Sequence, residues 1–308
     1  MQNLEEKKYW IWLSLIQNLG SKKKQMLLKK YENPQTIYHL KEKELSEIKG
    51  IGDKTIQNIL DRNRKDSVEA HMKYMIKNDI DIISIYDEEY PRILKEIYDP
   101  PISLYCRGDK TILNQKAIGI VGCREATEYG KNAAKYFAYH LAKQEINIIS
   151  GLAKGIDSYA HIGAICAKKE ENNPPIKSYL HVEKIKGSGK TIAVVGNGLD
   201  IVYPKENEML AKQIIEEGGA ILSEYPLGIK PDKMNFPARN RIISGMSKGI
   251  LVVEAKEKSG TLITVDFALE QGRDVFVVPG NINSLHSVGT NRLIQQGAKL
   301  VTNYSEIF

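Results

Sequence analysis

The residues best suited to chemistry in this chain are donor-rich side chains at the expected start of a helix, in the segment NFPARNRIISGMS. Arg239, Asn240 and Arg241 open this helix. Two guanidinium groups and an amide beside a helix N-terminus favour an anion. Phe236 adds an aromatic face on which a nucleobase can stack. The segment therefore predicts a site for a nucleic-acid phosphate and its base.

One of these two arginines has an alternative structural role. A buried guanidinium commonly pairs with a carboxylate, and the acidic candidates in the chain are Glu224 and Glu254. We expect Arg241 rather than Arg239 to form such a pair. The two roles lead to different side-chain positions, and the sequence leaves both open for Arg241.

Two glycine loops follow apolar runs and suit the close approach of an anion. In GIVGCREATEYG, Gly122 ends an expected strand and Arg124 follows it. In SGLAKGID, Ser150 and Gly151 end a strand and Lys154 lies in the loop. Backbone N–H groups in such loops bind phosphates, and an arginine adds a bidentate contact.

A third loop, EAKEKSGTLIT, ends in a hydroxyl-rich helix start. Its Ser259, Gly260 and Thr261 offer hydroxyl and N–H donors that suit an anion, although simple capping of the helix explains the same residues. We expect these loops to lie together, since the carboxyl ends of strands in a parallel sheet share one edge.

Two enzymatic interpretations fit these loops poorly. A serine, Asp157 and His161 lie within twelve residues, but the strand–elbow pattern G-x-S-x-G is absent and Asp157 is expected to cap the next helix. The first loop also lacks the G-x-G-x-x-G fingerprint of dinucleotide-binding proteins. We therefore expect no catalytic residue, no cofactor and no metal ligand.

A further motif, EIKGIGDKTIQNI, is typical of a helix-hairpin-helix. Its glycines permit a tight turn, and the next helix can present its N-terminus to a DNA phosphate, although many such hairpins only pack. An earlier segment, NLGSKKK, looks like a degenerate copy. The residues that would form a secondary DNA contact are Lys49, Gly50, Gly52 and Lys54.

Composition sets broad limits on these interpretations. A net charge of +6 permits a polyanionic partner but does not require one. Three dispersed cysteines indicate reduced thiols rather than disulfides or a zinc site. The chain shows neither a secretory signal nor a membrane-length apolar run, so a cytoplasmic protein is expected.

The pattern of apolar runs predicts the fold. Unbroken apolar strands alternate with helical segments from residue 116, which indicates an extended Rossmann-like, mostly parallel α/β sheet with helices on both faces. We expect a small all-α domain over residues 1–65, of the helix-hairpin-helix or SAM-like type, a connecting segment over 66–115, and the core over 116–308. The polar stretch 168–190 is expected to be a surface insertion.

The motifs and their order resemble the DprA/Smf family of DNA-processing proteins. The resemblance covers residues 80–308 and is carried by seven ordered segments: GCREATEYG, SGLAKGIDSYAHIGAI, NGLDIVYPKEN, LSEYPLG, NFPARNRIISGMS, EAKEKSGTLITVDFALEQGRDVFVVPG and GTNRLIQQGAKLV. It implies a cytosolic homodimer that binds single-stranded DNA and loads RecA recombinase in natural transformation and recombination.

The resemblance also implies roles for particular residues. Arg124 and Lys154 match basic positions of the family's pocket, and Arg239 and Arg241 match its FPxRNR pair. The chain ends after the core, so the winged-helix domain of many members is expected to be absent. Two other classes stay open: a phosphoribohydrolase-like enzyme, disfavoured because Pro279-Gly280-Asn281 lacks a second glycine, and a protein-interaction scaffold.

Overall fold

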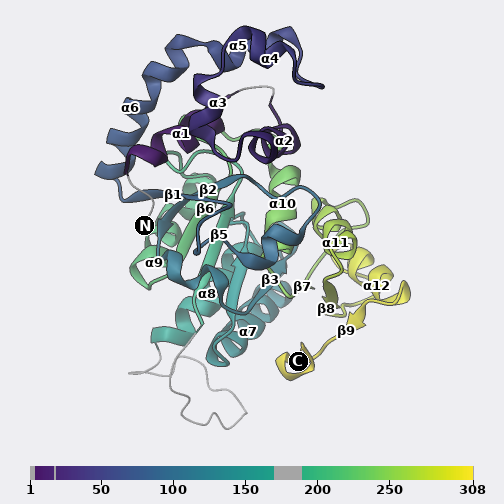
Figure 1. The fold of residues 1–308 in the computed structure, drawn as a ribbon. Helices are drawn as coiled ribbons and strands as arrows, with labels where there is room; N and C mark the ends of the chain where they lie inside the picture. The colour runs from purple at the N-terminus through teal and green to yellow at the C-terminus, as the bar shows by residue number, and fades with distance from the viewer. Residues whose placement is uncertain (1–3, 17–18, 170–188, 308) are drawn as a thin grey trace.

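The computed structural model describes residues 4–16, 19–169 and 189–307, in which a bundle of helices lies beside one edge of a mixed nine-stranded sheet (Figure 1). The chain completes the helical bundle first and then enters the sheet. The expected α/β class with helices on both faces is confirmed.

The bundle is held together by the apolar side of its first helices. Trp12 and Leu13 of the first helix are fully buried, as is Leu27 of the second. These side chains pack against others from the whole bundle and from the nearest strands. The helices are α1 (Leu4–Leu15), α2 (Ser21–Tyr31), α3 (Pro34–His39), α4 (Glu42–Ser46), α5 (Asp53–Leu60) and α6 (Arg62–Lys77).

The sheet has the order β1-β2-β6-β5-β4-β3-β7-β8-β9. Strands β1 and β2 are antiparallel to each other, β2 is antiparallel to β6, and all other pairs are parallel. The strands are β1 (Ile80–Ser84), β2 (Ser103–Gly108), β3 (Ala117–Val121), β4 (Asn147–Ser150), β5 (Thr191–Val195), β6 (Ala220–Ser223), β7 (Gly249–Val252), β8 (Asp274–Val277) and β9 (Lys299–Leu300).

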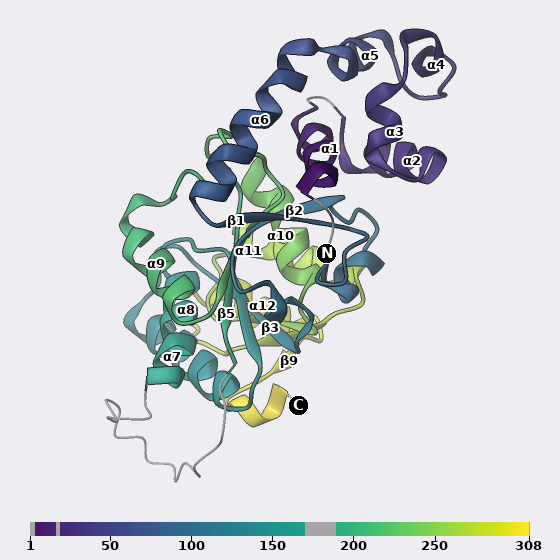
Figure 2. The same cartoon turned by 60° about the vertical axis from the view of Figure 1, so that its left-hand side comes forward.

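Helices cover both faces of the sheet because successive strand residues point to opposite sides. In β5, Ile192 and Val194 pack in one cluster with α10, while Ala193 and Val195 pack in another with α9. One face carries α7 (Glu128–Lys143), α8 (Ile156–Lys169) and α9 (Glu208–Glu216). The other carries α10 (Asn235–Gly245), α11 (Gly260–Glu270) and α12 (Val288–Gln295) (Figures 1 and 2).

Short 3-10 helices complete the described chain. They are η1 (Arg92–Glu96), η2 (Lys110–Asn114), η3 (Lys205–Asn207) and η4 (Tyr304–Ile307). None of the helices that the structure describes combines the length and apolar character that a bilayer crossing needs.

The segment expected to connect the two domains, 66–115, contains the end of α6 and the strands β1 and β2. Helix α6 runs through the boundary placed at residue 65, and β1 and β2 belong to the same sheet as the core. Strand β2 was not expected. Its sequence, SLYCRG, is short, and it pairs with β6, which lies far away along the chain. The division into domains stays a prediction, and most of the expected insertion at 168–190 lies outside the described residues.

Candidate functional site

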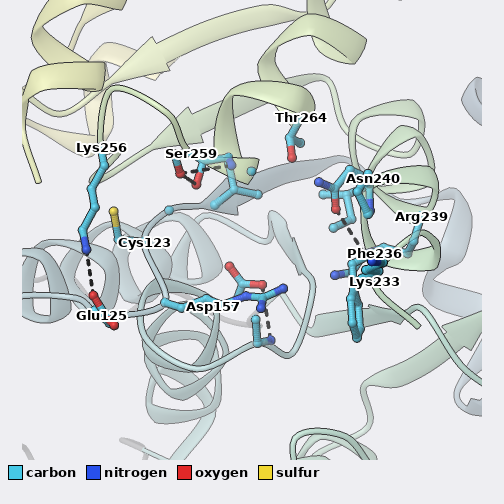
Figure 3. Close-up of a pocket in the computed structure, with 18 of the residues that line it drawn as sticks. Cys123, Glu125, Asp157, Lys233, Phe236, Arg239, Asn240, Lys256, Ser259 and Thr264 are labelled. Atoms are coloured by element: carbon cyan, nitrogen blue, oxygen red, sulfur yellow. Dashed lines mark hydrogen bonds and ion pairs between the residues drawn. The ribbon is translucent and has the colours of Figure 1, made fainter. Parts of the chain in front are cut away.

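A cleft of about 730 Å³ opens at the carboxyl ends of β3 and β7 (Figure 3). Strand β3 has β4 on one side and β7 on the other. The helices that follow β3 and β7 lie on opposite faces of the sheet, so the loops that lead to them diverge. Open α/β sheets bind ligands at such a point. The cleft is lined mainly by three segments, 121–125, 231–243 and 256–264, together with Ala153, Asp157 and Tyr203.

The first loop reaches the cleft because Gly122 packs closely on α8. A Cβ atom at Gly122 would lie 2.5 Å from the side chain of Ile156. Arg124, two residues on, is exposed. Its guanidinium carbon lies 5.4 Å from the centre of the Phe236 ring, a cation–π contact. This arrangement leaves the guanidinium donors of Arg124 available at the cleft.

Across the cleft, Arg239 is held in a fixed position below the surface. Only 5% of the residue is exposed, and its guanidinium donates to the carbonyl oxygens of Gly151, at 2.9 Å, and Val194. Burial lowers the pKa of Arg239 to about 10, and Asp157 opposes that shift. The side chain therefore stays cationic at neutral pH and gives the floor of the cleft a positive charge.

Asp157 supports this floor rather than capping α8 as expected. Helix α8 begins at Ile156, one residue earlier. The Asp157 carboxylate instead accepts hydrogen bonds from the backbone N–H groups of Gly151, at 3.1 Å, and Ala153, at 3.3 Å. Burial raises the pKa of Asp157, while the charge of Arg239 acts in the opposite direction. Asp157 thus holds the 151–153 loop beside Arg239.

The serine, aspartate and histidine of this region serve separate structural roles. The Ser150 hydroxyl donates to the carbonyl oxygen of Ile120, at 2.6 Å. His161 Nδ1 lies 2.6 Å from the Thr191 hydroxyl, and burial lowers the pKa of His161 to about 3. A serine whose proton is donated to a carbonyl is not activated by that histidine. Among the described residues, no cluster of three potential metal ligands is present.

Helix α11 supplies the third wall of the cleft. Ser259 caps it, accepting from the Thr261 N–H at 3.2 Å and donating to the Thr261 hydroxyl at 3.0 Å. Helix starts carry N–H groups without partners inside the helix and a partial positive charge. The Ser259-Gly260-Thr261 segment lines the cleft, so the expected capping is compatible with an anion there.

Arg241 lies on the back of α10 and forms the predicted pair with Glu224. Both terminal nitrogens of Arg241 are 2.8 Å from the carboxylate oxygens of Glu224. The Arg241 Nε donates to the carbonyl oxygen of Asp99. The alternative partner, Glu254, accepts from Thr127 instead. Arg241 is not part of the cleft lining, which argues against a direct role in binding an anion there.

Glu224 also connects the core to the helical bundle. Its carboxylate accepts a 2.7 Å hydrogen bond from the hydroxyl of Ser21, the first residue of α2. Ser21 belongs to the segment that resembles a degenerate DNA-binding hairpin. The start of α2 therefore contacts a carboxylate of the core.

The structure brings together eight of the predicted site residues and separates the others from them. Those that line the cleft are Gly122, Arg124, Phe236, Arg239, Asn240, Ser259, Gly260 and Thr261. Ser150 and Gly151 are buried behind it, and the ammonium group of Lys154 pairs with Glu206 on the exposed surface. Lys49, Gly50, Gly52 and Lys54 are exposed on the distant helical bundle.

The cleft residues that sequence reasoning missed include Tyr203 and three lysines, Lys233, Lys256 and Lys258. The lysines had a signal, because Lys256 and Lys258 lie within the motif EAKEKSGTLIT and Lys233 lies two residues before NFPARNRIISGMS. Lys256 pairs with Glu125 at 2.7 Å across the mouth of the cleft (Figure 3). The Tyr203 ring stacks on Phe236, with ring centroids 5.5 Å apart and planes inclined by 25°.

The fold and site define a class of protein: a Rossmann-like core with a cationic cleft, joined to a helix-hairpin-helix bundle. Residues 81–308 match the model of the family described as DNA recombination-mediator protein A, and residues 13–65 match that of the SAM-like helix-hairpin-helix tandem. The chain belongs to the DNA recombination-mediator protein A family, also called DprA/Smf, as the sequence predicted.

Individual relatives agree with this assignment. The chain is 43% identical over 230 residues to DNA processing protein DprA of Bacillus subtilis, covering 74% of this chain and 70% of that protein. The X-ray structure of DprA from Streptococcus pneumoniae aligns with a TM-score of 0.79 at 35% identity, over 97% of this chain and 96% of the other. A DprA structure from Helicobacter pylori, described for its single-stranded DNA binding mode, aligns with a TM-score of 0.61 at 30% identity, over 74% and 93% of the two chains.

Proposed function

We propose that the cleft binds single-stranded DNA. The observation that carries this proposal is the combination of five basic side chains with a stacked aromatic pair in one cleft. Basic grooves with aromatic faces bind single strands, since cations contact the phosphates and any base can stack. The basic residues are Arg124, Lys233, Arg239, Lys256 and Lys258.

The charges of the cleft favour a polyanion over a small neutral ligand. Glu125 and Asp157 are the acidic groups of the lining, so the five basic residues outnumber them. Asp157 is committed to backbone N–H groups and Glu125 to Lys256. A strand passing the mouth would therefore meet Arg124 and the two remaining lysines, with the start of α11 as a further phosphate seat.

The biological role that follows is that of a mediator acting by binding, without a catalytic step. We propose that a homodimer of the chain holds the incoming strand and delivers it to RecA recombinase in the cytoplasm. The family assignment and the single-stranded DNA binding of the Helicobacter pylori relative support this role. Two clefts in one dimer would raise the affinity for a long strand without new contacts.

Binding is tested with fluorescence anisotropy of a labelled dT20 oligonucleotide. The double variant Arg124→Ala/Lys258→Ala should lose about tenfold or more in affinity, because two phosphate contacts disappear. Lys248→Ala is the matched control, since Lys248 is exposed at the opposite end of β7. Equal affinity for the wild type and the double variant would overturn the assignment of the cleft, and release of free base from nucleoside monophosphates would favour an enzyme.

Delivery to the recombinase is tested separately. DNA-dependent ATP hydrolysis by RecA should start sooner on a protein-coated single strand when the wild-type chain is present. The double variant should give no such acceleration. If both proteins accelerated ATP hydrolysis, the effect on RecA would not depend on the cleft.

A further inference from the structure

A second, smaller cavity lies next to the cleft, between α9 and the sheet. Its volume is about 240 Å³. Pockets that hold drug-sized ligands span about 300–1,000 Å³, so this cavity suits a single ring system rather than a larger molecule. Its walls are mainly aliphatic side chains from β5, β6, α9, the loop after β4 and the 199–202 loop: Leu152, Val195, Leu199, Ile201, Val202, Ala211, Ile215 and Ile221.

The cavity adjoins the cleft at one shared side chain. Tyr203 lines both spaces, and its ring stacks on Phe236 of the cleft. On the other side, Leu152 lines the cavity while the next residue, Ala153, lines the cleft. Tyr203 and Val202 are 44% and 37% exposed, which leaves this shared wall open to solvent. A strand held in the cleft would therefore come close to the cavity at Tyr203.

The segment between the two spaces has an unusual backbone. Leu152 has a φ of 56°, in the left-handed region that residues other than glycine seldom adopt. Its neighbour Gly151 is fixed by Asp157 and Arg239, and its backbone carbonyl accepts from Arg239. The contacts that hold the floor of the cleft thus also hold Leu152 against the cavity. Such conformations persist where the surrounding structure enforces them, often at binding sites.

The polar rim of the cavity matches the edge of a base. Arg107, Glu208, Lys212 and Glu216 also line the cavity, and the ammonium group of Lys212 lies 3.8 Å from the carboxylate of Glu208. Together they offer donors and carboxylate acceptors, which are the groups that pair with the carbonyl and amino substituents of nucleobases. An apolar interior with a mixed polar rim suits a flat heterocycle better than a phosphate, which needs an excess of positive charge.

We propose that the cavity is a base-binding subsite, which accepts one nucleobase of the strand whose phosphates lie in the cleft. The proposal rests on the proposed function of the cleft and adds to it a second space, on the far side of Tyr203. The phosphates supply the charge-dependent part of the affinity, and the inserted base supplies a part that depends on burial of its ring.

The test is to fill the cavity and to compare two ligands of equal charge. Ala211→Phe places a ring in the cavity from α9, and Ile215→Trp does so from the next turn of that helix. Met209→Trp is the matched control, because Met209 lies on the exposed side of α9. The ligands are dT12 and an abasic strand of the same length, measured by anisotropy at fixed salt, after thermal melting has identified the variants that fold.

The cavity-filling variants should bind dT12 about tenfold more weakly than the wild type, with unchanged affinity for the abasic strand. Unchanged affinity for dT12 overturns the proposal and leaves the cavity to another occupant, such as an apolar side chain of a partner protein. Equal losses on both ligands also overturn it, since the substitutions would then act on phosphate contacts. Failure of the wild type to bind either ligand would instead refute the proposed function of the cleft.

Discussion

Arg239 and Arg241 lie two residues apart on α10 and point to opposite sides of that helix. Arg239 enters the floor of the cleft, whereas Arg241 pairs with Glu224 against the helical bundle. Two positions on a helix are separated by about 200°, so a paired motif of this spacing serves two surfaces. One arginine charges the binding site, and the other fixes the helix that carries it.

Glu224→Gln should destabilise the protein by about 3 kcal/mol, since it leaves the buried guanidinium of Arg241 without its main partner. Chemical denaturation by urea, followed by circular dichroism, gives the free energy of unfolding. Ser21→Ala removes one hydrogen bond to the Glu224 carboxylate but keeps the ion pair, and should cost about 1.5 kcal/mol. A Glu224→Gln cost no larger than that of Ser21→Ala would contradict the importance of the ion pair.

Glu125→Gln should strengthen single-strand binding. Glu125 holds Lys256 at the mouth of the cleft, and both side chains are largely exposed. Exposed pairs contribute about 0–1 kcal/mol, so releasing Lys256 should raise the affinity for dT20 by roughly two- to fivefold. Lys256→Ala should act in the opposite direction. Weaker binding by Glu125→Gln would show that Glu125 aids the strand rather than competing with it.

Binding should weaken with salt in proportion to the number of phosphates contacted. If Arg124, Lys233 and Lys258 each neutralise one phosphate, the plot of log affinity against log salt should have a slope of about −2. Arg124→Ala should make that slope shallower by about 0.7. A titration between about 50 and 200 mM NaCl measures both values. An unchanged slope in the variant would exclude a phosphate contact for Arg124.

Stability should rise with pH above about 8 because of Lys24. Burial lowers the pKa of this ammonium group to about 8 from a usual 10.5. The folded state therefore binds fewer protons than the unfolded state between these two values, and raising the pH through this window favours folding. The gain should be roughly 1–3 kcal/mol and should disappear in Lys24→Met. Lys23→Met, at the exposed neighbouring lysine, should keep it; equal pH profiles for all three proteins would contradict the assignment.

The sequence was informative where local pattern decides structure. The apolar runs from residue 117 to 277 become the parallel strands, because only strands buried on both faces tolerate unbroken apolar sequence. The positions of Gly122 and Arg124 follow from β3, since residues just past a strand end have little choice of position. The pairing of Arg241 with a carboxylate was also predictable from the need of a buried cation for a partner, while the choice of Glu224 over Glu254 was not.

Contacts between distant segments could not be predicted from the local sequence pattern. Strand β2 pairs with β6, more than one hundred residues later, and no periodicity in its short run indicates this. Lys154 looks like a cleft residue in sequence, but its pairing with Glu206 depends on where η3 lies. The Tyr203–Phe236 stack likewise joins two loops whose approach is set only by the completed sheet.

Because the loops diverge at β3, the residues proposed to contact the strand differ from the residues that stabilise the fold. The exposed groups of the cleft project from loops beyond the strand ends, while the hydrophobic clusters lie between the sheet and its helices. Substitutions at positions such as Arg124, Lys233 or Lys258 therefore remove little buried apolar surface. A lineage, or an engineer, can retune how tightly the strand is held with little loss of thermal stability, whereas changes at Arg239 would alter both properties together.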